Sequence, residues 1–187
     1  MSSPRIIAVV GATGAQGGGL VRSILADPSG GFKVRALTRK STGDKAEELR
    51  KLGAEVVAAD LDDVASVTKA FEGAYGAYCL TNFWEHFSPA KEVAQAGNMA
   101  QAAKAARLSH VVWSTLEDTR KRVPLSDPRM PTLQEKYKVP HFDARAMRMR
   151  CSRRPDCRSP IYSRRSTGTT SSTSAWGRRR APTASTR

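Results

Sequence analysis

Residues 6–18, IIAVVGATGAQGG, decide the fold of this chain. The apolar run Ile6–Val10 predicts a buried strand, and the stretch from Ala15 to about Ala26 has the apolar spacing of a helix. Between them lie glycines at positions 11, 14 and 17, in the pattern G-x-x-G-x-x-G. Such glycines allow a sharp turn, close approach of a diphosphate and tight helix packing, while the helix N-terminus attracts the anion. The stretch therefore predicts a dinucleotide-binding loop, with a ligand-free glycine-rich turn as the alternative.

The alternation of short apolar runs with longer helical stretches continues to about Ser114. Helices are predicted over 44–52, 63–71 and about 89–106, and further strands over Lys33–Thr38, Ala54–Ala58, Ala74–Leu80 and His110–Ser114. Strands that alternate with helices form βαβ units with right-handed crossovers. We therefore expect an α/β fold, a Rossmann-like doubly wound parallel sheet of about five strands in the order 3-2-1-4-5.

The positive charge of the chain is concentrated at its C-terminal end. The 187 residues carry a formal charge of +14, but residues 144–187 hold 12 arginines and one acid, which leaves only +3 for residues 1–143. Residues 144–187 also contain 14 Ser or Thr and, among Ile, Leu, Val and Phe, only Ile161. Such a segment buries too little apolar area to offset its ordering entropy. We expect a dinucleotide-binding domain over 1–143 and a disordered basic tail over 144–187.

Composition also bounds the class of protein. A net charge of +14 alone would suggest a nucleic-acid partner. Because residues 1–143 are nearly neutral and the charge lies in the tail, such a partner is disfavoured. No apolar run approaches the roughly 20 residues of a membrane span, and the N-terminus lacks the features of a signal peptide, so a cytoplasmic protein is expected. Three cysteines form no disulfide framework and no metal-ligand spacing, so no metal is predicted.

Two cations follow the second predicted strand. An acid near this point accepts hydrogen bonds from the adenosine ribose in proteins that prefer NAD, but none occurs here before Asp44. Arg39 and Lys40 instead suit a 2′-phosphate, which the planar guanidinium grips well. NADP(H) is therefore favoured over NAD(H), with solvated loop charges as the alternative reading.

The strand order predicts which loops face the ligand. The first and fourth strands flank the point where the crevice opens, so Thr81, Asn82 and Phe83 should lie opposite the glycine loop. Asp60 should lie near the adenine, and Ser114 should point toward the nicotinamide. These placements follow from topology alone, and packing or solvent exposure is the alternative for each.

Several ordered motifs together resemble the NmrA-like family, relatives of the short-chain dehydrogenases. They are GATGAQGG, KVRALTR, GAEVVAADLDD, TNFWE, HVVWSTLED and HFDA, spread over residues 4–144. The resemblance implies an NADP(H)-binding Rossmann domain and a smaller C-terminal region that completes the substrate side. It implies either a redox-sensing regulator with a regulatory protein partner or an NAD(P)H-dependent oxidoreductase of a quinone or similar molecule. The cofactor contacts expected from the loop, the cations and the resemblance are Gly11, Ala12, Thr13, Gly14, Ala15, Gln16, Gly17, Arg39, Lys40, Asp60, Leu61, Thr81, Asn82 and Phe83.

Two positions depart from the family pattern. A lysine of the helix after TNFWE is replaced by Gly97, and the Tyr-x-x-x-Lys dyad of the short-chain dehydrogenases becomes His141-x-x-x-Arg145. The weak catalytic candidates are therefore Ser114, which has no adjacent base by spacing, and His141, which is better suited to a structural or cofactor contact. A sensor is favoured over a reductase, and nucleic-acid binding by the basic tail is a third alternative.

The resemblance stops at Arg145. In a reading frame shifted by one base, synonymous codons allow Arg145–Arg150 to read Gly-Asp-Glu-Asp-Ala after a lysine, similar to the family's continuation. Residues 166–177 likewise allow an aromatic Tyr-Trp-Asp-Asn segment of family type. The hypothesis is a truncated product of a frame change near Ala144, and the alternative is a genuine basic tail that binds nucleic acid or an acidic membrane. The nucleotide sequence around codon 144 decides between them.

Overall fold

The computed structural model of the chain describes residues 3–152 and 161–165. Its centre is a parallel sheet in the order β3-β2-β1-β4-β5-β6. The strands are β1 (Arg5–Val10), β2 (Phe32–Thr38), β3 (Glu55–Ala58), β4 (Gly76–Cys79), β5 (His110–Thr115) and β6 (Ile161–Arg165). The predicted order of the first five strands is confirmed, and the predicted strand limits differ from the observed ones by at most two residues.

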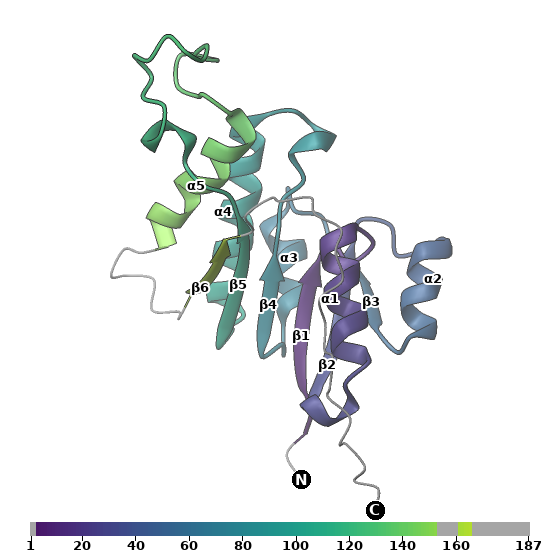
Figure 1. The fold of residues 1–187 in the computed structure, drawn as a ribbon. Helices are drawn as coiled ribbons and strands as arrows, with labels where there is room; N and C mark the ends of the chain where they lie inside the picture. The colour runs from purple at the N-terminus through teal and green to yellow at the C-terminus, as the bar shows by residue number, and fades with distance from the viewer. Residues whose placement is uncertain (1–2, 153–160, 166–187) are drawn as a thin grey trace, which may run out of the picture.

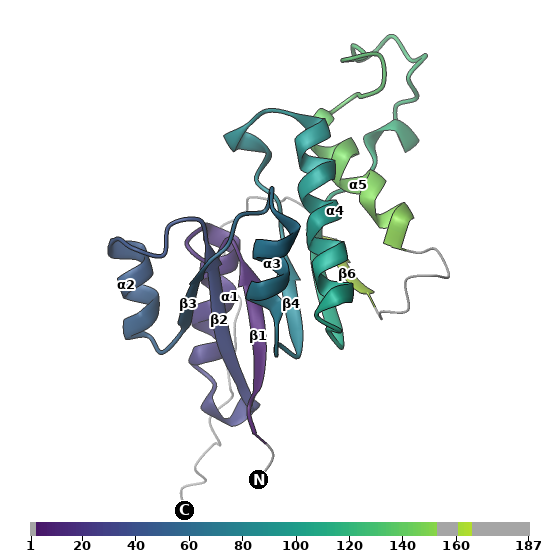
Figure 2. The ribbon, with the colours of Figure 1, turned by 180° about the vertical axis from the view of Figure 1, so that it is seen from behind.

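Helices cover both faces of the sheet (Figures 1 and 2). They are α1 (Ala15–Leu25), α2 (Asp44–Lys51), α3 (Val64–Phe71), α4 (Pro89–Ala105) and α5 (Pro140–Ser152), with short 3-10 turns η1 (Pro28–Gly30), η2 (Phe83–Glu85) and η3 (Thr119–Lys121). Figure 1 shows α1 on one face, and Figure 2, from behind, shows α3 and α4 on the other. This is the doubly wound arrangement that the sequence predicts.

Two apolar cores result, one on each side of the sheet. On the α1 side, Val9 and Val34 pack with Val21 of α1. On the opposite side, Phe71 of α3 and Met99 of α4 are fully buried against the strands. Because both faces of the central strands are covered, their side chains are apolar without alternation.

Regular structure extends into the segment for which the sequence predicts disorder. Helix α5 crosses the predicted boundary at residue 144, and β6 pairs in parallel with β5, Val111 opposite Ile161. The compositional argument weighs side-chain burial, whereas an edge strand offers backbone hydrogen bonds to any sequence. The rest of the predicted tail, residues 153–160 and 166–187, lies outside the described residues.

A buried carboxylate organises the segment between β5 and α5. Asp143 of α5 is fully buried and accepts hydrogen bonds from the backbone amides of Thr119 (2.8 Å), Lys138 (2.8 Å) and Val139 (3.2 Å). These donors satisfy a group that would otherwise be costly to bury. The loop is thus tied at two points to the start of α5, which packs against α4.

The contact between the glycine loop and α1 leaves no room for a side chain. A Cβ on Gly17 would lie 2.4 Å from the carbonyl oxygen of Gly11, whereas one on Gly19 would meet nothing within 4 Å. Gly11 itself has a φ of 66°, in the left-handed region that glycine adopts most readily. The spacing of the glycines therefore reflects backbone-to-backbone packing at the start of the first crossover.

These two helical glycines make a matched test. Gly17→Ala forces the helix away from the loop and should lower the free energy of unfolding by about 1–3 kcal/mol. Gly19→Ala, on the same helix, should raise it by about 0.5–1 kcal/mol, because alanine is the better helix former. Urea unfolding followed by circular dichroism measures both, and equal effects of the two substitutions would contradict this account of the loop.

Candidate functional site

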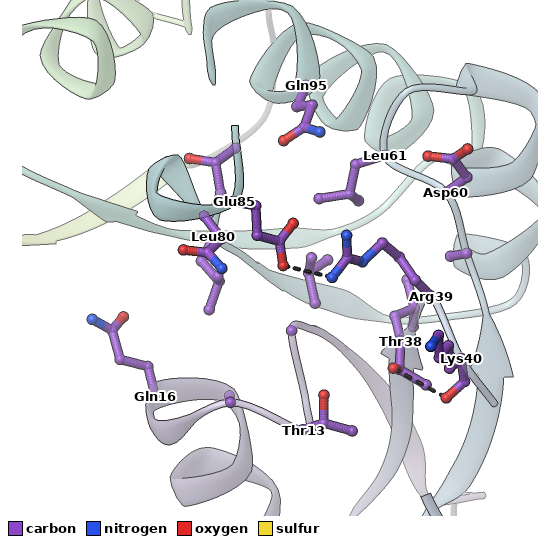
Figure 3. A pocket seen from close by; sticks show the side chains of 18 of the residues that line it. Thr13, Gln16, Thr38, Arg39, Lys40, Asp60, Leu61, Leu80, Glu85 and Gln95 are labelled. Carbon is purple, nitrogen blue, oxygen red and sulfur yellow. Dashed lines mark hydrogen bonds and ion pairs between the residues drawn. The ribbon is translucent and has the colours of Figure 1, made fainter. Parts of the chain in front are cut away.

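An open groove of about 1290 Å³ lies at the carboxyl ends of the central strands. The glycine loop, the end of β2 and the loops after β3 and β4 form its walls (Figure 3). Of the expected cofactor contacts, the groove is lined by Gly11, Thr13, Gly14, Ala15, Gln16, Gly17, Arg39, Lys40, Asp60, Leu61, Thr81 and Asn82. Residues from four separate parts of the sequence therefore share one cavity.

Two expected contacts are absent from the lining of this groove. Ala12 is buried, and its amide donates to the carbonyl oxygen of Leu37, so it joins the loop to β2. Phe83 is also buried and packs against the rings of Trp84 and His141. In both cases the neighbours in sequence line the groove while the residue itself faces the interior.

The N-terminus of α1 faces the groove without a side-chain cap. Gly14 occupies the N-cap position, has no side chain to accept from the first-turn amides, and is followed by no acid in that turn. The unpaired amides and the helix dipole together favour a negatively charged group at this point. This end of the groove is suited to a diphosphate.

A second positive region lies at the end of β2. Arg39 and Lys40 are exposed and line the groove, and the Arg39 guanidinium contacts the Glu85 carboxylate of η2 at 2.6 Å. Figure 3 shows Arg39 reaching across from β2 toward Glu85. The sequence predicts the cations, but the acid that faces Arg39 comes from a different loop.

Side chains of α4 fix the loop after β3. Gln95 donates to the Asp62 carboxylate at 2.9 Å, Lys91 pairs with Asp62 at 2.7 Å, and Asn98 donates to the backbone oxygen of Leu61 at 2.8 Å. Hydrogen bonds from Lys91 and Gln95 lower the pKa of Asp62 below its ordinary value. Asp60 and Leu61 are thereby held in the groove wall where an adenine is expected.

Ser114 meets the groove only through Gln16. Its hydroxyl donates to the Gln16 side-chain oxygen at 2.8 Å, and the Tyr78 hydroxyl donates to the same oxygen at 3.0 Å. These contacts join β5, β4 and α1 and orient a groove residue. Ser114 therefore has a positioning contact rather than a basic partner that would activate it as a nucleophile.

A buried ionic cluster lies beneath the groove at Thr81. Glu92 of α4 is only 1% exposed, accepts from the Thr81 hydroxyl, and pairs with Arg145 of α5 at 2.6 Å. Arg145 also donates to the backbone oxygen of Thr81. The cluster joins α4, α5 and the loop after β4, and sequence spacing gave no sign of Glu92. Of the residues in this cluster, Arg145 was marked in the sequence as the second position of the dyad.

His86 completes this cluster. The Ser88 backbone amide donates to its Nδ1 at 3.1 Å, so the neutral imidazole carries its proton on Nε2. Nε2 lies 3.8 Å from the second Glu92 oxygen, and both atoms are buried without a hydrogen-bond partner. His86 thus lies beside the cluster, just before the start of α4.

His141 lies in an aromatic cluster rather than in the groove lining. Its ring packs 4.9 Å from Trp84 and 5.4 Å from Phe83, measured between ring centroids. Burial, followed by the nearby Arg145 cation, lowers the pKa of His141 below 6.5. This shift favours the neutral imidazole, in keeping with the place of His141 among aromatic rings.

Other chemistries find little support in the part of the chain that the structure describes. No group of three His, Cys, Asp or Glu residues there is arranged to hold a metal ion. Cys79 is free and buried in an apolar setting, which raises the pKa of its thiol. No helix within residues 3–152 is long and apolar enough to cross a bilayer.

Comparison with known proteins agrees with this geometry. The model of the NmrA-like family matches residues 3–153. The chain belongs to the NmrA-like family. Among curated NmrA-like relatives, the oxidoreductase FrzB of Cladobotryum sp is 36% identical over 145 residues, which are 73% of this chain and 41% of FrzB. The oxidoreductase hkm9 of Aspergillus hancockii is 46% identical over 81 residues, 43% of this chain and 24% of that protein.

Solved NmrA structures share the fold. NmrA, a negative transcriptional regulator, in complex with NADP superposes with a TM-score of 0.66 and 26% identity, covering 88% of this chain and 45% of NmrA. Its complex with NAD gives a TM-score of 0.63 and 26% identity over the same shares. The chain thus spans less than half the length of these NmrA-like relatives. What it shares with them is a Rossmann-like NAD(P)-binding fold.

The buried ionic cluster of Thr81, Glu92 and Arg145 makes a second matched test. Glu92→Gln removes a buried charge and leaves Arg145 without its ionic partner, which should cost about 3–5 kcal/mol of unfolding free energy. Glu55→Gln breaks the ion pair with Arg35, in which Glu55 is half exposed, and should cost about 0–1 kcal/mol. Chemical denaturation compares the two. A loss at Glu92 no larger than that at Glu55 would contradict the structural role of the cluster.

Proposed function

We propose that this NmrA-like chain binds NADP(H) in the groove and acts as a redox-sensing regulatory protein. The observation that carries the proposal is that one cavity holds both the uncapped N-terminus of α1 and the cations Arg39 and Lys40. A dinucleotide diphosphate on the helix would leave the ribose phosphate within the range of the cations. Neither feature alone would point to a dinucleotide, and the presence of both in one groove supports the proposal.

The preference for NADP(H) over NAD(H) rests on charge. The end of β2 carries two cations and no acid before Asp44, whereas recognition of an unphosphorylated ribose uses an acid there. NmrA structures exist with each dinucleotide, which supports binding of either form in this fold. We place Asp60 and Leu61 at the adenine and Gln16, Thr81 and Asn82 toward the nicotinamide.

An alternative function is that of an NAD(P)H-dependent oxidoreductase of a quinone or similar small molecule. The names of the curated relatives, such as the oxidoreductase FrzB, favour it. The residues at the two dyad positions favour the sensor, because Arg145 is engaged by Glu92 and Thr81 and His141 is packed among aromatic rings outside the groove lining. Oxidation of NADPH in the presence of a quinone separates the two functions.

Reversing one charge tests the cofactor assignment. Arg39→Glu removes a charged hydrogen-bond donor from the 2′-phosphate and should weaken NADPH binding by at least about tenfold. NADH lacks that phosphate, so its affinity should change by less than about threefold. Fluorescence titration of each reduced dinucleotide measures the dissociation constants.

The matched control for this titration is Arg122→Glu. Arg122 is similarly exposed and pairs with Glu117 outside the groove lining, so its reversal should leave both affinities unchanged. Equal weakening of NADPH and NADH by Arg39→Glu would argue against the phosphate contact.

A further inference from the structure

The Arg39–Glu85 ion pair crosses the groove above the glycine loop. Arg39 follows β2 and Glu85 belongs to η2 after β4, while β1 lies between these two strands in the sheet. The pair therefore joins the two walls on either side of the loop that follows β1, as Figure 3 shows. A ligand that uses Arg39 must meet Glu85 at the same place.

We propose that Glu85 sets the balance between NADP(H) and NAD(H) in this groove, an inference that rests on the proposed dinucleotide function. With NADP(H), the 2′-phosphate displaces the Glu85 carboxylate from Arg39. With NAD(H), Arg39 stays paired and Glu85 accepts a hydrogen bond from the adenosine ribose. One acid thus opposes the phosphorylated form and supports the unphosphorylated one.

The ion pair is weak enough to be exchanged. The side chains of Arg39 and Glu85 are 66% and 37% exposed, and ion pairs in water contribute little because solvent screens them. A phosphate monoester carries more negative charge than a carboxylate and accepts from the guanidinium in a bidentate manner. The 2′-phosphate therefore replaces Glu85 at Arg39. The affinity for NADP(H) is lowered by the free energy needed to break the Arg39–Glu85 ion pair.

Two of the other three acids that line the groove contact neighbouring residues. Asp62 is held by Lys91 and Gln95, and Asp60 accepts from the backbone amide of Asp62 at 2.9 Å. Asp44 lies in the first turn of α2. Glu85 is the groove acid that contacts the cation expected at the 2′ position, so it takes the place of the missing acid after β2.

The test compares Glu85→Gln with the wild-type chain in titrations with NADPH and NADH. The substitution keeps the size of the side chain and removes its charge, so Arg39 is freed. The ratio of the NADH dissociation constant to that of NADPH should rise about three- to fivefold, within the range expected for an exposed ion pair. Titration with 2′,5′-ADP and 5′-ADP should show the same change, which places the effect at the adenosine end.

Two variants supply the controls. Glu117→Gln neutralises an acid in a comparably exposed ion pair with Arg122 and should leave the ratio unchanged. In an Arg39→Gln background, Glu85→Gln should lose the part of its effect on the ratio that comes from freeing Arg39. A ratio that does not move with Glu85→Gln, or that moves equally in the Arg39→Gln background, overturns the role of Glu85. A wild-type chain that binds neither dinucleotide overturns the proposed function itself.

Discussion

The close approach of Gly17 to the carbonyl of Gly11 is the constraint on which the site depends. A single Cβ at position 17 would lie within 2.4 Å of that oxygen, so the packing is possible only for glycine. The contact brings the first turn of α1 to the end of the central strand β1. The unpaired amides of the helix are thereby aimed at the same groove that receives the ends of β2 and β4. Without the contact between Gly17 and Gly11, the cations after β2 would line a groove that lacks a binding position for a diphosphate.

The fold was predictable because its strands are buried on both faces. Continuous apolar runs such as Ile6–Val10 and longer helical stretches between them leave few alternatives to a doubly wound sheet. Helix ends were also marked, for example by Pro89 at the start of α4. The sixth strand was not predictable, because the sequence of residues 161–165, IYSRR, has no apolar run and β6 pairs with β5 through the backbone.

The site was predictable where topology fixes it and not where side chains must find one another. Arg39 and Thr13 line one groove because the strand order places their loops together. Phe83 lies between groove residues in sequence but turns into the interior, because η2 directs it onto His141. Glu85 and Glu92 were missed as partners of Arg39 and Arg145. These pairs link positions 46 and 53 residues apart, and they depend on side-chain directions that spacing does not reveal.

Cofactor binding and proton transfer make different demands on the residues of this site. Binding of a dinucleotide requires positive groups near its phosphates. The groove supplies them through the uncapped N-terminus of α1 and the exposed cations after β2. A reductase of a carbonyl or quinone also needs a group that delivers a proton near neutral pH. Arg145 is paired with the buried Glu92, and burial lowers the pKa of the His141 imidazole. The residues at the two dyad positions thus have packing and ionic partners within the fold, Arg145 with Glu92 and His141 with Trp84.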